Sequence, residues 1–389
     1  MAIENRLALR CVTVLLAAAS SYAAFADDTT TSPSGRRCSQ DWVDNHLRMN
    51  QLQLIGTHNS YKLALPDEEL AAHRAVDAEG ADSIDYAHRP LAEQLDRGLR
   101  SLELDVYLDP QGGRYLEPPG AHRRGYTRSP WTADQRQKMQ RPGFKVMHLA
   151  DIDFRSNCLT LQDCLSIIRT WSQAHPRHLP ILMTLNAKDG RSGAGAVQPL
   201  PFDAAAFDAL DAEIRTALPD SQLITPDKVQ GAHRTLRDAV RADGWPLLGQ
   251  ARGKVFLALD EDPRKVALYR GARRSLEGRA MFVNSDEASP AAAYLTLNDP
   301  LGDGTRIARA VAAGYMVRTR ADADTREARD NDTQRREAAF RSGAQYVSTD
   351  YPWPDERWGG YRVRFPSHAP YARLNPANGN PKCPSLDLE

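Results

Sequence analysis

The stretch LQLIGTHNSY, residues 52–61, contains a strand signal followed directly by polar residues. Its first five residues form a short, mostly apolar run of strand length, and His58 and Asn59 come just after it. Seven further runs of this kind occur along the chain, at residues 102–107, 144–148, 181–185, 255–259, 280–283, 315–317 and 346–348. Helical stretches lie between them, for example residues 91–99, 161–171, 204–218 and 325–340. Strands that alternate with helices indicate parallel βαβ units.

Eight such runs predict an α/β fold of the (β/α)8 TIM-barrel class, as a single domain. Such a barrel carries its chemistry at the carboxyl ends of its strands, and polar residues occur there in this sequence. Long segments at residues 62–90, 109–142 and 187–203 follow strand signals, so we expect long loops on the catalytic face. The alternative, an open doubly wound sheet, should show a glycine-rich turn after its first strand, but GTHNSYK has one glycine.

The composition is that of a globular protein with a sizeable core. The chain has 389 residues, of which 41% are hydrophobic and 26% are charged. Fifty Lys and Arg balance fifty Asp and Glu, which excludes the basic footprint needed for non-specific nucleic-acid binding. We expect the barrel at residues 45–364, between an N-terminal tail at 27–44 and a C-terminal tail at 365–389.

The N-terminus has the features of a secretory signal peptide over residues 1–26. Arg6 and Arg10 precede an apolar run at residues 11–19, and Ala24-Phe25-Ala26 fits a small-x-small cleavage pattern. An anchor helix is the alternative, but the apolar run is too short to span a bilayer. We therefore expect a secreted or periplasmic protein.

Four cysteines remain when that segment is removed: Cys38, Cys158, Cys164 and Cys383. An even number of cysteines in an exported chain suggests disulfide bonds. Of the three pairings, we favour Cys158 with Cys164 as a local link and Cys38 with Cys383 as a link between the termini. The alternative is that some of the four stay reduced.

Two carboxylates lie in the second run, which reads LELDV at residues 102–106. Glu103 and Asp105 are two residues apart, so both point to one face of a strand. Close carboxylates repel each other and tend to bind a cation, and oxygen donors suit Ca²⁺ better than Zn²⁺. We therefore predict a Ca²⁺ site formed by Asn59, Glu103, Asp105 and Asn186. The alternative is a set of strand-end salt bridges to Arg100 or a lysine.

His58 and His148 lie at the ends of the first and third runs. Cleavage of a phosphodiester needs one group that deprotonates the attacking hydroxyl and one that protonates the leaving oxygen. Two histidines that flank a phosphate held at the cation would supply both groups. A lone histidine at a strand end is more often structural, so this prediction depends on the pair and on the nearby carboxylates.

Five stretches occur in a characteristic order: LIGTHNSY at residues 54–61, LELDV at 102–106, VMH at 146–148, VRTRAD at 317–322 and VSTDY at 347–351. Together they resemble the calcium-dependent phosphoinositide-specific phospholipase C family of microbial type, over most of residues 51–354. The resemblance implies a TIM barrel that cleaves phosphatidylinositol-like lipids to diacylglycerol and a phosphorylated inositol, with the inositol 2-hydroxyl as nucleophile. It also implies that His58 and His148 are catalytic and that Asn59, Glu103 and Asp105 bind Ca²⁺.

Asn186 departs from this resemblance, because related phospholipases C carry a glutamate on the fourth strand. An amide oxygen still binds cations but brings one negative charge less. We therefore expect weaker Ca²⁺ binding, or a ligand supplied by Asp189 or Asp260 instead.

Three basic residues are candidates for substrate binding. Lys188 resembles a phosphate-contacting lysine of related enzymes, with a surface lysine as the alternative. Arg318 and Arg320 would hold the phosphate or the inositol hydroxyls by forked hydrogen bonds, or else pair with Asp322 and Asp324.

Two other functions stay open from the sequence. A glycerophosphodiester phosphodiesterase would use a similar barrel, ion and histidine pair, although its His-Arg-Gly pattern on the first strand is absent. The second is a barrel that binds an inositol lipid or glycan without turnover.

The expected partner is a phosphoinositide or related phosphodiester, with transient contact to a membrane surface and no protein partner implied. Tyr115, Tyr126 and Trp131 would touch lipid or, alternatively, pack within their own loop.

Overall fold

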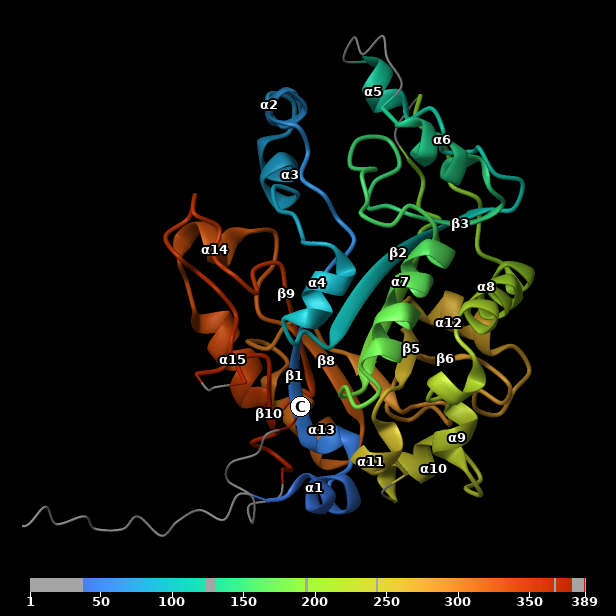
Figure 1. Cartoon of the computed structure of the whole chain (residues 1–389), viewed down its shortest axis with the longest axis vertical. Coiled ribbons are helices and arrows are strands. Elements are labelled where there is room, and N and C mark those ends of the chain that lie inside the picture. Colours follow the sequence, from blue (N-terminus) through green and yellow to red (C-terminus); the bar gives the residue numbers. More distant parts are fainter. Residues whose placement is uncertain are drawn as a thin grey trace, which may run out of the picture. The chain divides into compact units, whose positions relative to one another are not determined.

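Two sheets of mostly parallel strands form the centre of the fold (Figure 1). A computed structural model describes residues 38–123, 130–192, 195–242, 244–366, 369–379 and Leu388. In the first sheet β1 (Leu52–Thr57), β9 (Tyr346–Thr349), β8 (Met316–Arg320) and β7 (Tyr294–Thr296) pair in parallel. In the second sheet β2 (Ser101–Asp109), β4 (Ile181–Ala187), β5 (Val255–Leu259) and β6 (Met281–Val283) do the same. Two further strands, β3 (Gly143–Val146) and β10 (Ala372–Leu374), pair antiparallel with β2 and β1.

The two sheets are joined at two places, between β1 and β2 and between β6 and β7. Beside β1 and β2, Arg100 N donates to Ile55 O at 3.0 Å. Between β6 and β7 a parallel bridge joins Asn284 to Tyr294. The parallel strands therefore follow one another in the order β1, β2, β4, β5, β6, β7, β8 and β9, which is the order of a (β/α)8 barrel. The predicted fold class is confirmed.

Two of the predicted strand positions differ from the structure. The run at residues 144–148 forms β3, which lies outside the parallel ring because it pairs antiparallel with β2, Val146 opposite Val106. The ring instead contains β7, which the sequence analysis did not predict. β7 lies within the mostly apolar stretch 291–297, which has no alternation of apolar and polar residues that would mark it as a strand.

Amphipathic helices cover the ring. In α7 (Leu161–Ala174) the Thr160 side chain accepts a hydrogen bond from Asp163 N and so caps the first turn. Leu161, Leu165 and Ile168 recur at helical spacing on the buried face. Further helices that lie between the strands along the chain are α4 (Leu91–Asp96), α8 (Ala204–Ala217), α9 (Pro226–Gln230), α10 (Leu236–Arg241), α11 (Leu248–Ala251), α12 (Pro263–Arg270), α13 (Gly304–Ala312), α14 (Arg326–Asp330) and α15 (Gln334–Ser342), and the 3₁₀ turns are η1 (Met49–Gln51) and η2 (Asp220–Gln222).

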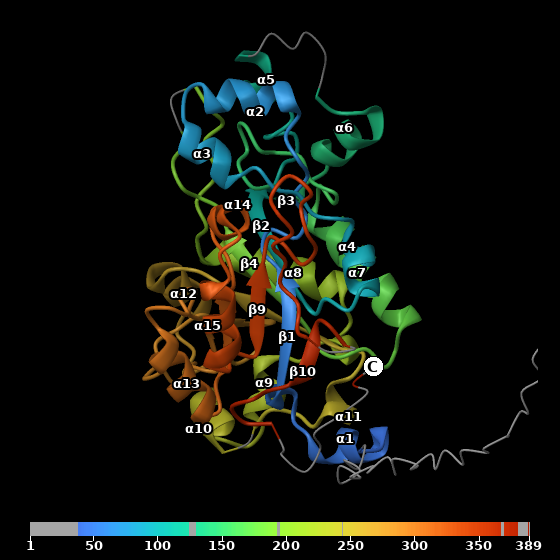
Figure 2. The ribbon, with the colours of Figure 1, turned by 90° about the vertical axis from the view of Figure 1, so that its left-hand side faces the viewer.

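The long segments that follow β1 and β2 lie beyond the carboxyl ends of the strands, as expected (Figures 1 and 2). They contain α2 (Asp67–Arg74), α3 (Ala78–Ser83), α5 (Pro119–Arg123) and α6 (Ala133–Gln140). Tyr115 and Trp131 are buried in a cluster formed by the loop after β2 and the segment after β3, where Trp131 packs against Phe154. Tyr126 lies outside the described residues.

The packed fold extends into both segments that the sequence analysis assigned to tails. α1 (Gln40–His46) buries Val43 completely. At the other end, β10 places Ala372 opposite Leu54 of β1. The predicted disulfide between Cys158 and Cys164 is confirmed. Cys38 is also disulfide-bonded, whereas its expected partner Cys383, like the predicted signal peptide, lies outside the described residues.

Gly56 is required where β1 meets β2. A Cβ atom at this position would lie 2.1 Å from the backbone oxygen of Ser101. Only a residue without a side chain permits so close an approach of two strands.

Gly56→Ala should therefore lower the free energy of unfolding by about 3 kcal/mol, because one strand has to move away from the other. Urea unfolding followed by circular dichroism measures this. Gly304→Ala is the matched control, since a Cβ there would meet no atom within 4 Å. Equal stability of the two variants would contradict the close contact.

Candidate active site

The turn after β1 is fixed by both neighbouring strands. His58 N donates to Thr349 O of β9 at 3.1 Å, and Ser60 N donates to Glu103 O of β2 at 3.0 Å. Between them Asn59 adopts a left-handed backbone with φ of 46°, which asparagine tolerates better than most residues. The turn thus places His58 and Asn59 at the carboxyl end of the ring.

His58 is bound to a carboxylate through one ring nitrogen. Its Nδ1 lies 2.9 Å from Asp350 Oδ1, and its Nε2 lies 3.4 Å from Arg320 Nη1. Since arginine can only donate, Nε2 is an acceptor and Nδ1 carries the proton. Burial, followed by the charge of Arg320, lowers the pKa of His58 below its ordinary value, although Glu103 and Asp350 oppose this. The neutral imidazole is therefore favoured.

Asp350 is held as an anion by its neighbours. Its Oδ2 accepts from Arg320 Nη2 at 3.1 Å. Burial alone would raise the pKa of Asp350, but His58, His88 and Arg320 together hold it well below the ordinary value. The adjacent Asp322 differs, because burial and the charge of Asp350 raise its pKa to about 7.

His148 is also bound to a carboxylate, which is a different one from the partner of His58. Its Nδ1 lies 2.9 Å from Oδ2 of the buried Asp153, which also lies 3.3 Å from Lys62 Nζ. The side chains of His58 and His148 are each 19% exposed, so both reach the surface of the site. The sequence analysis missed Asp153 and Lys62. The one hint in the sequence to this contact is the position of Asp153, five residues after His148.

The predicted oxygen ligands lie together at the ends of β2 and β4. Asn186 Nδ2 donates to both Glu103 Oε1 and Asp105 Oδ1, at 3.0 Å each. The Tyr61 hydroxyl, whose pKa is raised by burial and by Asp105, donates to Asn59 Oδ1 at 3.3 Å. Asn59, Glu103, Asp105 and Asn186 therefore surround one small region.

Basic side chains already pair with these carboxylates. Lys188 Nζ lies 3.0 Å from Asp105 Oδ2, and Arg318 forms a close ion pair with Glu103 Oε2. Burial raises the pKa of Asp105, but Lys188, His148 and Asn186 outweigh it, so the net pKa is lowered. Lys188 is thus part of the site and not a free surface lysine.

The two arginines of β8 form their ion pairs with Glu103 and Asp350, and not with Asp322 and Asp324, which the sequence analysis considered as partners. Arg318 contacts Glu103 and also donates to Asn298 Oδ1 at 2.8 Å. Arg320 binds Asp350, and it reaches Asp322 through the backbone oxygen at 2.9 Å.

The donor chemistry of this region fits Ca²⁺. Two carboxylates and two amide side chains can supply a hard-oxygen set of the kind Ca²⁺ prefers. In this structure Asn186 presents Nδ2 to Glu103 and Asp105, so its amide has to turn over before its oxygen can bind the ion. Among the described residues no three His, Cys, Asp or Glu side chains are grouped as metal ligands, so the two asparagines would have to complete the set. Of the alternatives, Asp189 pairs with Lys265 at 2.7 Å. Asp260 lies 3.7 Å from Arg318 Nη1, and burial raises its pKa to about 6.

The fold and the site define an enzyme of the α/β-barrel class. The sequence model of the Ca²⁺-dependent phosphoinositide phospholipase C family matches residues 47–376. The chain belongs to this family, which confirms the resemblance seen in the sequence. It is accordingly a Ca²⁺-dependent phosphoinositide phospholipase C. No curated protein matches the chain.

Two similar solved structures are of a calcium-dependent phosphoinositol-specific phospholipase C from the Gram-negative bacterium Pseudomonas sp. The apo form with a myo-inositol complex has a TM-score of 0.53 and 16% identity, covering 87% of this chain and 100% of that chain. A second crystal form of the apo enzyme has the same score and identity and covers 85% and 96%. At 16% identity the similarity to these structures supports the fold alone.

Asn186→Asp should lower the dissociation constant of Ca²⁺ by about tenfold, since ligand charge sets the affinity of oxygen sites. Calorimetric titration of the full chain with Ca²⁺ measures this without any substrate. Asn331→Asp adds the same charge at an exposed position and should change nothing. Unchanged affinity in Asn186→Asp would show that Asn186 is not a ligand.

Proposed function

We propose that the chain is an exported phosphodiesterase that cleaves phosphatidylinositol-like lipids to diacylglycerol and an inositol phosphate, with His58 and His148 as the proton-transferring groups. The observation that carries this proposal is that each histidine binds its own buried carboxylate, Asp350 or Asp153, through Nδ1. Both Nε2 atoms are then available for proton transfer beside the Glu103 and Asp105 region.

His58 is suited to the role of base. Asp350 holds the proton on Nδ1, and Nε2 accepts from Arg320 at 3.4 Å, so Nε2 carries an unprotonated lone pair that takes a proton once the substrate hydroxyl replaces this contact. Nε2 takes the proton of the inositol 2-hydroxyl as this oxygen forms its bond to phosphorus. The product of that step is a cyclic inositol phosphate.

His148 then acts as the acid. The bond that breaks joins phosphorus to the glycerol oxygen, and this oxygen takes a proton from Nε2 of His148. Asp153 stabilises the protonated ring through Nδ1, in the same manner as Asp350 holds His58.

The other residues of the site would bind the cation, contact the substrate or orient the base. A Ca²⁺ ion at Asn59, Glu103, Asp105 and Asn186 would stabilise the phosphate oxygens in the transition state and lower the pKa of the hydroxyl. Lys188 and Arg318 lie against the same carboxylates and are positioned to contact the phosphate or the inositol. Arg320 contacts both Asp350 and His58, so it orients the base.

Export is proposed from the signal-like residues 1–26 and is supported by the Cys158–Cys164 disulfide. Within the described parts of the chain, no helix combines the length and apolar character needed to cross a bilayer. Contact with a membrane surface would be transient, during lipid cleavage.

The test is an assay of residues 27–389 on phosphatidylinositol vesicles. Chelator should abolish the release of diacylglycerol and inositol phosphate, and added Ca²⁺ should restore it. Release of glycerol phosphate from deacylated lipids alone would instead indicate a glycerophosphodiester phosphodiesterase. Lipid binding that persists in chelator without any product would indicate a non-catalytic barrel.

Asp350→Asn should lower kcat by about 10²–10⁴-fold with little change in KM, because the amide no longer fixes the proton of His58 as a carboxylate does. Steady-state kinetics on the same vesicles separate the two constants. Asp330→Asn, an exposed aspartate of α14, is the control and should keep full activity. Full kcat in Asp350→Asn would rule out the base role assigned to His58.

A further inference from the structure

A cavity of about 580 Å³ opens on the flank of the barrel, beside α15 and β10. It lies on the outer side of β1 and β9, where Ile55 and Val347 pack with Phe340 and Phe365. The described residues between β9 and β10 form no helix, so the outer face is covered there by an irregular segment. The residues that line the cavity are Arg336, Glu337, Phe340, Arg341, Arg362, Arg364, Phe365, Pro366, Arg373 and Pro376. None of them belongs to the candidate active site.

The lining of this cavity, which we call the flank cavity, is strongly basic. It includes five arginines and a single carboxylate, Glu337, which is already paired with Arg336 at 2.8 Å. Arg341, Arg362 and Arg364 are exposed, and none of the three forms a salt bridge within the described residues. In a chain with no net charge, this is a local excess of positive charge.

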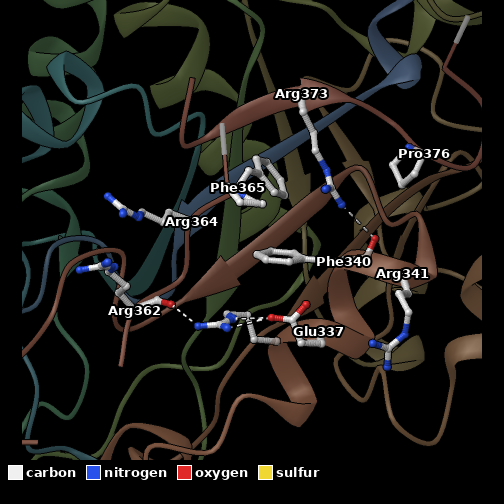
Figure 3. A pocket seen from close by; sticks show the side chains of 10 residues that line it. Glu337, Phe340, Arg341, Arg362, Arg364, Phe365, Arg373 and Pro376 are labelled. Atoms are coloured by element: carbon white, nitrogen blue, oxygen red, sulfur yellow. Dashed lines mark hydrogen bonds and ion pairs between the residues drawn. The ribbon is translucent and has the colours of Figure 1, made fainter. Parts of the chain in front are cut away.

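The aromatic floor of the flank cavity lies between the arginines. Figure 3 shows Arg362 and Arg364 on one side of Phe340 and Phe365, and Arg341 on the other. The Arg373 guanidinium lies 4.3 Å from the ring centre of Phe365. Phe340 and Phe365 are only 6% and 1% exposed, so a ligand in the cavity would meet mainly the cationic donors at its rim.

Arg373 is held in place by hydrogen bonds but by no ion pair within the described residues. Its Nε and Nη2 donate to the buried Gln53 Oε1 at 2.9 and 2.6 Å, and Nη2 also donates to Phe340 O at 3.3 Å. Its Nη1 has no hydrogen-bond partner among the described residues. Burial lowers the pKa of Arg373, and Glu337 is the charged group that opposes this. A half-buried cation without an ion pair is costly, and a bound anion offsets that cost.

We propose that the flank cavity binds a phosphate-bearing anion at a site separate from the active site. The ligand class is a small phosphate ester, for which a phosphorylated cyclitol or sugar serves as the probe. Guanidinium groups bind phosphate oxygens through paired N–H donors, and the exposed Arg341, Arg362 and Arg364 have such donors free of ion pairs in the part of the chain that the structure describes. The volume lies within the range of small-ligand sites. Both a soluble ester and a lipid head group have this chemistry.

The test compares two double variants of the full chain. Arg341→Gln/Arg364→Gln removes two rim charges, and Arg234→Gln/Arg274→Gln removes two exposed charges elsewhere as the matched control. Calorimetry in chelator uses inositol trisphosphate and, separately, inorganic phosphate. We expect the rim variant to weaken trisphosphate binding by about tenfold or more, with phosphatidylinositol cleavage unchanged.

A third variant tests the role of Arg373 itself. Arg373→Lys keeps the charge but removes Nη1, the guanidinium nitrogen that has no partner among the described residues, and it should also weaken binding if its circular dichroism spectrum is that of the parent. Sedimentation with phosphatidylcholine vesicles, with or without phosphatidylinositol 4-phosphate, identifies the source of the ligand. Binding that depends on the rim arginines in the vesicles alone indicates a lipid head group, and binding in solution indicates a soluble ester.

The proposal is overturned if the parent binds neither the trisphosphate nor the vesicles. It is also overturned if the rim and control variants lose affinity equally, because the effect would then be one of net charge. Loss of cleavage without loss of trisphosphate binding would contradict a separate site. Failure of the phospholipase assay does not bear on this proposal, since the calorimetry needs no turnover.

Discussion

The close approach of β1 to β2 at Gly56 determines where the site residues lie. A side chain at this position would collide with the backbone of Ser101. Without one, the strands are near enough for Ser60 N to reach Glu103 O and for Glu103 N to donate to Ser60 Oγ at 2.8 Å. These bonds hold the turn that contains His58 and Asn59 directly beside the carboxylates of β2. A backbone constraint thus converts two distant segments into one site, with His58 Nε2 at 3.6 Å from Glu103 Oε1.

Each buried carboxylate of the site forms an ion pair with a basic side chain. Glu103 pairs with Arg318, Asp105 with Lys188, Asp350 with Arg320, and Asp153 with Lys62. Unpaired burial of a charged carboxylate would be strongly unfavourable, so each basic side chain offsets the cost of burying its partner. The same pairs have a consequence for the metal. Ca²⁺ has to compete with two cations for Glu103 and Asp105, and Asn186 contributes no compensating negative charge. Both effects act in the direction of weak Ca²⁺ binding.

The sequence predicted the barrel and most of its parallel strands because each strand is followed by polar residues at a regular place. It also predicted the Cys158–Cys164 link, which needs only proximity along the chain. It failed for β3 because an apolar run of strand length does not reveal whether the strand is parallel. It failed for Asp153 because the contact with His148 arises when the loop folds back, with Leu149 and Asp153 forming an antiparallel bridge. Such a contact depends on loop geometry and leaves no periodic pattern.

The antiparallel direction of β3 explains how the second histidine reaches the site. β2 continues past the ring, so Asp109 lies beyond the carboxyl ends of its neighbours, and Gly143 of β3 is paired there. From that point β3 runs back toward the ring, with Val146 opposite Val106. The chain therefore returns to the level of the carboxylates two residues before His148, and the charge of His148 acts on Asp105. A parallel strand of the ring would also have ended at the carboxyl face, so either strand direction brings His148 to the level of Asp105. The sequence analysis expected both histidines at one group of carboxylates through a parallel third strand, whereas His148 arrives there on the antiparallel β3, which returns along the extension of β2.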